Sequence, residues 1–179
     1  MKTHFHWSLR LLHWLMALAV LAMLFIGAGM VSSVSARHLW LVDLHKPLGV
    51  AILVLAVLRL SLRLATGAPP LPGELPKAAQ LAAKVSHLLL YGLLLALPLV
   101  GWAMLSAGGY PVSLGGGWQL PPLLAQSDHW YALLRPAHRW LAYGLLVLIL
   151  GHMAAALVHR LVRRDGVLAS MTWQRRPSR

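Results

Sequence analysis

The sequence predicts an all-α integral membrane protein that folds as a bundle of four transmembrane helices. Of the 179 residues, 59% are hydrophobic and only 11% are charged, whereas about 25% of the residues in a soluble domain are charged. The apolar residues are gathered into four long stretches rather than spread along the chain. A soluble core of this size cannot bury so much apolar surface, so the composition requires lipid as the solvent.

Three of the four predicted spans are clear from length and apolarity alone. Residues 8–30, 84–106 and 136–160 each contain a nearly uninterrupted apolar run, and about 20 such residues cross about 30 Å of hydrocarbon. We expect residues 107–135, between the last two of these spans, to form a long loop on the outer side. The first span is too long for a signal peptide and lacks a convincing cleavage site. We therefore expect it to remain in a single membrane domain, residues 1–179.

The fourth span, residues 45–65, is weaker because its fully uncharged part covers only residues 47–58 and is followed by Arg59 and Arg63. An amphipathic helix on the membrane surface is the alternative. Such a helix needs a broad polar face, whereas residues 50–58 are apolar on every side. We predict a span whose arginines reach to the interface.

The basic residues predict the orientation of these spans. Four spans put both termini on one side of the membrane, and 12 of the 16 lysines and arginines lie on that side. By the positive-inside rule both termini are cytoplasmic, and we expect a multi-pass membrane protein. The net charge of +12 then reflects topology and anionic lipid headgroups, so we expect no nucleic-acid partner.

Histidine is the residue type whose distribution points to chemistry. Cysteine is absent, which excludes disulfides, thiolate metal sites, iron–sulfur clusters and thiol nucleophiles. Of the 10 histidines, six lie at or inside the ends of predicted spans. They are His13, His45, His87, His138, His152 and His159. Ionisable groups at membrane depth are costly and usually functional.

Four of these histidines fall into two pairs at two depths. His152 follows His138 by 14 residues, which is about 21 Å along a helix and within about 40° of the same direction. His45 begins its span at the outer depth of His138, and His13 lies at the inner depth of His152. Because haem iron takes two imidazoles on opposite sides of the macrocycle, these pairs predict two bis-histidine haems.

Three alternatives remain open at this point. A zinc site usually needs three or four ligands at one depth, and the spans offer neither cysteine nor carboxylate for it. A proton relay normally includes carboxylates as well. The third alternative is a four-helix membrane protein whose histidines only bond neighbouring helices.

Four sequence blocks, in order along nearly the whole chain, resemble the prokaryotic cytochrome b561 family. The blocks are Leu12-His13-Trp14, His45-x3-Gly49 with Arg59-Leu60-x-Leu62-Arg63-Leu64, His87-Leu88-x2-Tyr91 with Ala96-Leu97-Pro98-x2-Gly101, and Gly151-His152-x-Ala154-Ala155-Ala156-Leu157-x-His159. The resemblance implies four helices that hold two haems b and pass electrons to or from ubiquinone. It implies that His13 and His152 bind the haem on the cytoplasmic side, and that His45 and His138 bind the haem on the periplasmic side.

The resemblance leaves two interpretations of which molecule donates the electrons. Similarity to compact members of the family implies an enzyme, a superoxide:quinone oxidoreductase that passes electrons from periplasmic superoxide through two haems to ubiquinone. Other members are haem-binding subunits. They imply a haem b relay that links a separate dehydrogenase or hydrogenase-type partner to the quinone pool.

The histidines left over at the cytoplasmic end predict a quinone pocket. His87 and His159 can supply the hydrogen bonds and protons that quinone reduction requires. We predict that Ser86, Tyr91 and Trp14 line the same pocket. The alternative for both histidines is hydrogen bonding to loop carbonyls at the interface, and His87 is also the main rival for an axial-ligand position.

Basic residues on the outer side are not explained by the positive-inside rule. They are Arg37, Lys46, Arg135 and Arg139. Beside a haem they would speed the encounter with a small anion, which the resemblance implies to be superoxide. Alternatively they neutralise haem propionates or lipid phosphates. Two interpretations also remain for Arg59 and Arg63. They set the membrane topology, or they contact haem propionates or a quinone.

Overall fold

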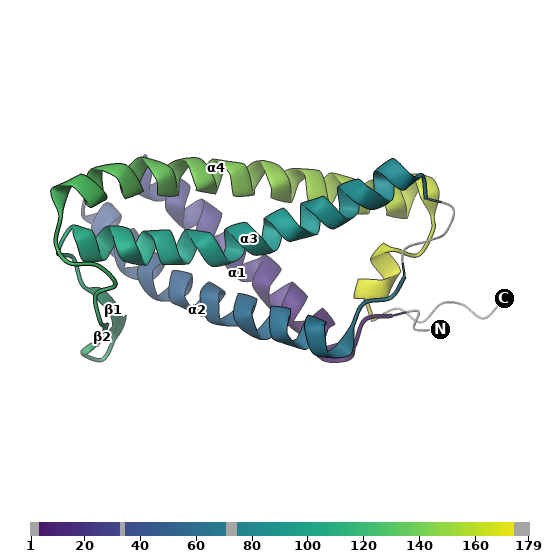
Figure 1. The fold of residues 1–179 in the computed structure, drawn as a ribbon, viewed down its shortest axis with the longest axis horizontal. Coiled ribbons are helices and arrows are strands. Elements are labelled where there is room, and N and C mark those ends of the chain that lie inside the picture. Colours follow the sequence, from purple (N-terminus) through teal and green to yellow (C-terminus); the bar gives the residue numbers. More distant parts are fainter. Residues whose placement is uncertain (1–3, 33–34, 71–74, 174–179) are drawn as a thin grey trace.

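The computed structural model describes residues 4–32, 35–70 and 75–173 of the chain, and four long helices account for most of them. They are α1 (Trp7–Val31), α2 (Ala36–Thr66), α3 (Lys77–Ala107) and α4 (Asp128–Val158) (Figure 1). In the described part of the chain these four helices are long and apolar enough to cross a membrane. The predicted all-α, four-helix membrane fold is therefore confirmed.

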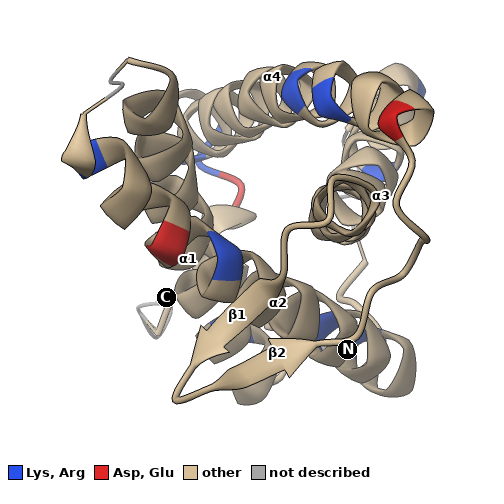
Figure 2. Cartoon of the chain, turned by 90° about the vertical axis from the view of Figure 1, so that its left-hand side faces the viewer, with Lys and Arg blue, Asp and Glu red and all other residues tan. Residues whose placement is uncertain are grey.

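The helices form a bundle in which α1 packs against α2, α3 against α4, and α2 against α3. Figure 2 looks along the bundle from one end and shows the helices arranged as a ring. Each helix contributes one residue to a central core of Val20, Ile52, Leu97 and Leu145. Large apolar side chains such as Phe25 cover the outer faces, as expected where lipid replaces water.

The two ends of the bundle differ. At one end, β1 (Val112–Gly115) and β2 (Trp118–Leu120) form a short antiparallel hairpin (Figure 1). Gly115 at the end of β1 and the two turn residues, Gly116 and Gly117, all have positive φ angles, which glycine adopts without strain. At the other end, the backbone N–H of Phe5 donates a hydrogen bond to the carbonyl of Ser170. We call these the hairpin end and the terminal end.

The loop predicted over residues 107–135 is too long, because α4 begins at Asp128 rather than at residue 136. The hydroxyl of Ser127 caps the helix by accepting a hydrogen bond from the backbone N–H of Trp130, and the acidic Asp128 lies in the first turn, where the helix dipole favours it. Pro136 lies inside the helix. It is the ninth residue of the helix, where a proline removes one backbone hydrogen bond, and here it does not end the helix.

After α4 the chain folds back onto α1 at the terminal end. The last turn of the helix widens into a π-helical segment, η1 (His159–Arg163), and a short 3₁₀ helix, η2 (Leu168–Met171), follows. The indole N–H of Trp14 donates to the carbonyl of Met171 at 3.0 Å, and Arg10 donates to the carbonyl of Thr172 at 2.8 Å. Residues 164–173 therefore cover the start of α1.

Candidate functional site

Two pairs of histidine rings approach each other across the bundle, at two depths. The centroids of the His13 and His152 rings lie 6.2 Å apart, with the ring planes at 72°. The centroids of the His45 and His138 rings lie 6.1 Å apart, with the planes at 69°. Because His138 precedes His152 on α4 by about 21 Å, the second pair lies nearer the hairpin end. We call the two sets the terminal-end pair and the hairpin-end pair.

Both separations fit two imidazoles bound to one metal ion. A metal–nitrogen bond of about 2 Å on each side, with about 1.1 Å from each nitrogen to its ring centroid, gives about 6.2 Å. Within residues 4–32, 35–70 and 75–173, no group of three or more His, Cys, Asp or Glu is placed to hold a metal ion. Two opposed imidazoles without a third protein ligand suit haem iron, whose other positions the macrocycle fills, better than zinc.

The hairpin-end pair has further features of a cofactor site. The Nδ1 atoms of His45 and His138 are buried, and neither has a hydrogen-bond partner among the described residues. Gly101 of α3 lies directly against His138, because a Cβ added there would be 3.1 Å from Cε1 and 3.3 Å from Nδ1 of the ring. Gly27 approaches His45 more loosely, at 3.9 Å. The glycine on α3 therefore makes room for the imidazole ring.

His87 joins the terminal-end pair from α3. Its ring centroid lies 5.7 Å from that of His152, which is closer than the centroid of His13. The Nδ1 atom of His87 lies 2.7 Å from the carbonyl oxygen of Ala83, so Nδ1 donates its proton there and Nε2 carries the lone pair. This is the tautomer that a metal ligand needs, and His87 stays a rival to His13.

Arg59 of α2 lies beside the same histidines and is almost completely buried, with 8% of its surface exposed. It interacts electrostatically with His13, His87 and His152, and it donates a hydrogen bond to the hydroxyl of Tyr91 at 2.7 Å. Sequence reasoning weighed Arg59 together with Arg63, since both suit an inside-positive interface. They differ in burial, because Arg63 is only partly buried and lies over the ring of Phe5, but Arg63 also interacts electrostatically with His87.

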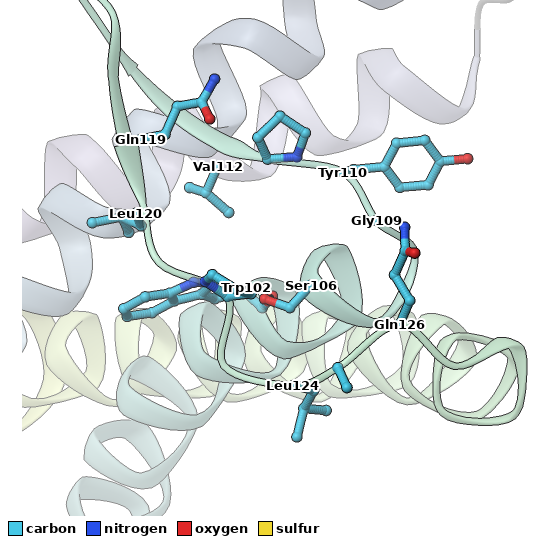
Figure 3. Close-up of a pocket in the computed structure, with 12 residues that line it drawn as sticks. Trp102, Ser106, Gly109, Tyr110, Val112, Gln119, Leu120, Leu124 and Gln126 are labelled. Atoms are coloured by element: carbon cyan, nitrogen blue, oxygen red, sulfur yellow. The ribbon is translucent and has the colours of Figure 1, made fainter.

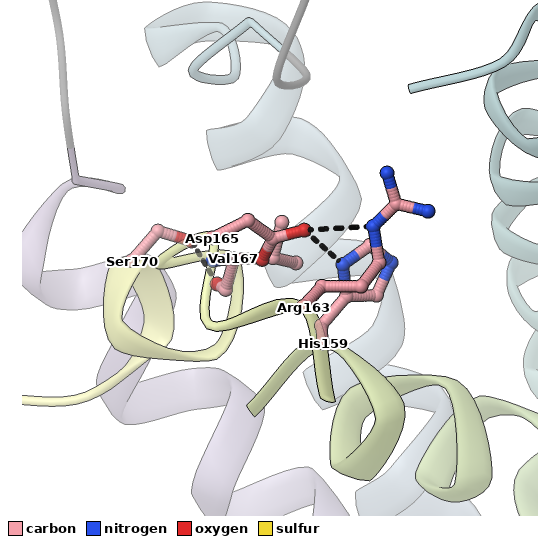
Figure 4. A network of polar contacts seen from close by, with 5 residues as sticks. All are labelled: His159, Arg163, Asp165, Val167 and Ser170. Carbon is pink, nitrogen blue, oxygen red and sulfur yellow. Dashed lines mark hydrogen bonds and ion pairs between the residues drawn. The ribbon is translucent and has the colours of Figure 1, made fainter. Parts of the chain in front are cut away.

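His159 is held by a carboxylate that the sequence analysis did not single out (Figure 4). Its Nδ1 atom donates to Asp165 at 2.5 Å, and Arg163 lies 3.6 Å from the same oxygen. Partial burial opposes ionisation of Asp165, but the hydrogen bonds from His159 and from the backbone N–H of Val167 hold its pKa below the ordinary value. The signal in the sequence was an acidic residue six positions after a histidine.

The other residues predicted for a quinone pocket lie at the terminal end without forming one described cavity. The Tyr91 hydroxyl accepts a hydrogen bond from Arg59, and the Trp14 indole donates to the C-terminal segment. Ser86 is half-buried on α3 beside His87. The quinone pocket stays a prediction.

The four basic residues predicted to steer an anion all lie toward the hairpin end. Arg37, Arg135 and Arg139 are exposed and Lys46 is half-buried. The guanidinium of Arg139 lies 6.0 Å from the centroid of the Trp140 ring. Throughout the described ranges, the ion pairs are those made by Asp165. None of the four basic residues is therefore neutralised by a carboxylate there.

A cavity of about 310 Å³ opens between the end of α3 and the hairpin loop (Figure 3). Trp102, Tyr110, Gln119 and Gln126 are among its lining residues, and no lining side chain is charged. The Trp102 indole donates to the carbonyl of Pro121 at 3.0 Å, which holds the loop against the helix. The sequence predicts a long loop over residues 107–135 but gives no signal for these lining residues.

Four apolar helices with two stacked imidazole pairs define a class, the membrane cytochromes that transfer electrons through haem. Residues 4–174 match the family described as prokaryotic cytochrome b561. The chain is 34% identical over 163 residues to "Cytochrome b561 homolog 2" of Escherichia coli (strain K12), covering 89% of this chain and 86% of the relative. It is 32% identical over 139 residues to "Probable superoxide oxidase CybB" of Yersinia pestis, covering 76% and 77%.

The chain belongs to the prokaryotic cytochrome b561 family. A second relative from Escherichia coli, "Cytochrome b561 homolog 1", is 29% identical over 143 residues, covering 79% of this chain and 80% of the relative. Membership makes the protein a haem b-binding membrane protein of electron transport, with helices that cross a bacterial membrane several times. The family predicted from the sequence is confirmed.

Proposed function

We propose that this chain binds two haems b, one at each histidine pair, and passes electrons from superoxide to ubiquinone. The observation that carries the proposal is the pair of centroid separations, 6.2 Å and 6.1 Å, at two depths of one bundle. When bound, haem supplies an iron that takes up and releases single electrons. The printed name of the Yersinia pestis relative supports superoxide as the donor.

The proposal places the hairpin end in the periplasm and the terminal end in the cytoplasm, across a bacterial inner membrane. Basic residues at the terminal end support this orientation through the positive-inside rule. Those described are Arg10, Arg59, Arg63, Lys77, Lys84, Arg160, Arg163 and Arg164. Lys2, Arg175, Arg176 and Arg179 were counted for the same prediction and lie outside the described residues.

On the donor side, the chain attracts superoxide, a small anion. Two superoxide ions each lose one electron and leave as dioxygen, which balances one two-electron reduction of a quinone. Arg37, Lys46, Arg135 and Arg139 outnumber Asp43 and Asp128 near the hairpin end. The resulting positive potential raises the local concentration and encounter rate of an anion.

On the acceptor side, ubiquinone must gain two electrons and two protons to become ubiquinol. His159 suits proton delivery because Asp165 fixes its Nδ1 atom, which leaves Nε2 to face a ligand. His87 lies on α3 at the same end, beside His152. We propose these two histidines as the groups that hydrogen-bond and protonate the quinone.

The test is haem quantitation with a reduced-minus-oxidised spectrum of the purified full-length chain. We expect two haems per chain, the loss of one in His13→Ala or His152→Ala, and the loss of the other in His45→Ala or His138→Ala. One haem per chain, or a loss in His87→Ala as complete as in His13→Ala, would contradict these ligands. Mixing with pulse-generated superoxide then tests the donor. A dihaem chain that superoxide does not reduce would instead be a relay for a separate dehydrogenase.

A further inference from the structure

Arg59 carries a charge in the interior of the bundle that its neighbours do not neutralise. Its side chain is 8% exposed, and its Nε atom is buried with no hydrogen-bond partner among the described residues. Its one described hydrogen bond donates to the Tyr91 hydroxyl, a neutral group, and the guanidinium carbon lies 5.3 Å from the centroid of the same ring. A buried cation with only neutral partners is strongly destabilising unless an anion joins it.

No carboxylate in the described part of the chain serves as that anion. Asp43 lies 16 residues before Arg59 on the same helix, about 24 Å away along the axis. Asp128 begins α4 at the hairpin end. Asp165 is already engaged by His159 and Arg163. The counter-charge therefore comes from a group that binds to the protein, or from Glu74, which lies outside the described residues.

The position of Arg59 indicates which bound group supplies the anion. Arg59 follows His45 on α2 by 14 residues, about 21 Å along the axis, so it lies at the depth of the terminal-end pair. Its hydrogen bond to Tyr91 places it against α3, the helix that carries His87. A haem held by the terminal-end pair would bring two propionate carboxylates into this region. Quinone carbonyls are neutral and would leave the charge of Arg59 uncompensated.

We propose that Arg59 and Tyr91 form a carboxylate-binding site for a propionate of the haem held at the terminal-end pair. This inference rests on the proposed haem at that pair. The unpartnered Nε–H and the remaining N–H groups of Arg59 give the planar fork that binds carboxylates. The Tyr91 hydroxyl accepts from Arg59 and so keeps its own proton to donate to the same carboxylate.

Such a site changes the reduction potential of the haem as well as binding its propionate. Reduction adds a negative charge to the haem, and a nearby cation stabilises the reduced form. Arg59 therefore raises the potential of the terminal-end haem relative to a site without this cation. The hairpin-end haem, at a separate depth, is less affected, so Arg59 increases the driving force for electron transfer toward the terminal end.

The experiment is a spectroelectrochemical titration of the purified dihaem chain. In Arg59→Gln we expect the reduction equilibrium of the terminal-end haem to shift at least tenfold toward the oxidised form, about 59 mV for one electron. The hairpin-end haem should be nearly unchanged. Tyr91→Phe should give a smaller shift in the same direction, and Arg59→Lys should retain part of the effect. Arg160→Gln removes an exposed positive charge at the same end of the bundle; it is the matched control and should shift neither haem.

A second arm identifies the carboxylate. The haem-depleted chain is reloaded with haem b or with its dimethyl ester, which lacks free carboxylates. We expect the ester to raise the potential of the terminal-end haem in the wild type, because it removes the negative charge that Arg59 holds beside the haem. The same ester should raise the potential less in Arg59→Gln, where no cation keeps the buried carboxylate ionised. This arm uses the unaltered chain, so it remains informative if Arg59→Gln does not assemble.

Three results would overturn the inference while leaving the proposed function intact. They are an unchanged potential in Arg59→Gln, an ester-loaded wild type that titrates like the native one, and a Glu74→Gln variant in which the potential of the terminal-end haem rises because Arg59 has lost its counter-charge. A wild-type chain whose spectrum contains no terminal-end haem would instead contradict the proposed function itself.

Discussion

Replacing Gly101 by alanine is a direct test of how the hairpin-end pair is built. The added Cβ would lie 3.1 Å from Cε1 of His138, whereas carbon atoms in contact lie about 3.5–4.0 Å apart. The imidazole must therefore retreat by roughly 0.4 Å or more, and metal sites accept deviations of only about 0.2 Å in their bond lengths. We expect Gly101→Ala to shift the spectrum and potential of the hairpin-end haem.

A graded series makes the assay decisive. Gly101→Val should lower the haem content from two per chain toward one, with the terminal-end haem retained. Gly92→Ala on the same helix is the control, because no atom lies within 4 Å of a Cβ at that position. Alanine also stabilises a helix by roughly 0.5–1 kcal/mol relative to glycine, so general unfolding would not explain a loss. Unchanged haem content and potentials in both Gly101 variants would refute the reasoning.

Charge reversal of Arg37 and Arg135 should slow haem reduction by pulse-generated superoxide without altering the haem spectrum. Raising the salt from 0.1 M to 1 M shortens the Debye length from about 10 Å to about 3 Å and should also slow haem reduction by superoxide in the wild type. If neither charge reversal nor salt changes this rate, these residues do not attract superoxide. His159→Ala should keep both haems reducible by dithionite while quinone reduction falls, and a normal quinone rate would exclude His159. The pKa of Asp165 is lowered in the folded chain, so its stabilisation of residues 164–173 is present above the unfolded pKa of about 3.9. It is lost as pH falls through the folded pKa. In the wild type, hydrogen exchange of the backbone amides in this segment should therefore rise as the pH falls through the folded pKa of Asp165. Asp165→Asn should remove that pH dependence.

The positions of the paired histidines were predictable because helix geometry alone relates them. A spacing of 14 residues on an uninterrupted apolar run puts His138 and His152 on one face at two depths. Their partners follow from the depths at which His13 and His45 enter the membrane. The start of α4 is not predictable in the same way, since the span expected at residues 136–160 follows the apolar run, whereas the cap at Ser127 starts the helix earlier.

The surroundings of the pairs were harder to predict than the pairs themselves. The charge of Arg59 already had a sufficient explanation in topology, so nothing in the sequence pointed to its burial against Tyr91. The return of the C-terminal segment onto α1 depends on backbone carbonyls, such as that of Met171, which accept from Trp14 and leave no signature in residue type. Asp165 accepts a hydrogen bond from His159 only because η1 and the turn after it bring the two side chains together.

Each histidine pair draws one member from α4, and this arrangement constrains how the protein matures. A nascent chain that has inserted only α1, α2 and α3 holds His13 and His45 without either partner. Neither binding site exists until the fourth helix has entered the membrane and packed against the others. On the proposed assignment, haem loading at both depths waits for the last insertion step, and a chain truncated before α4 would assemble with neither site rather than with one.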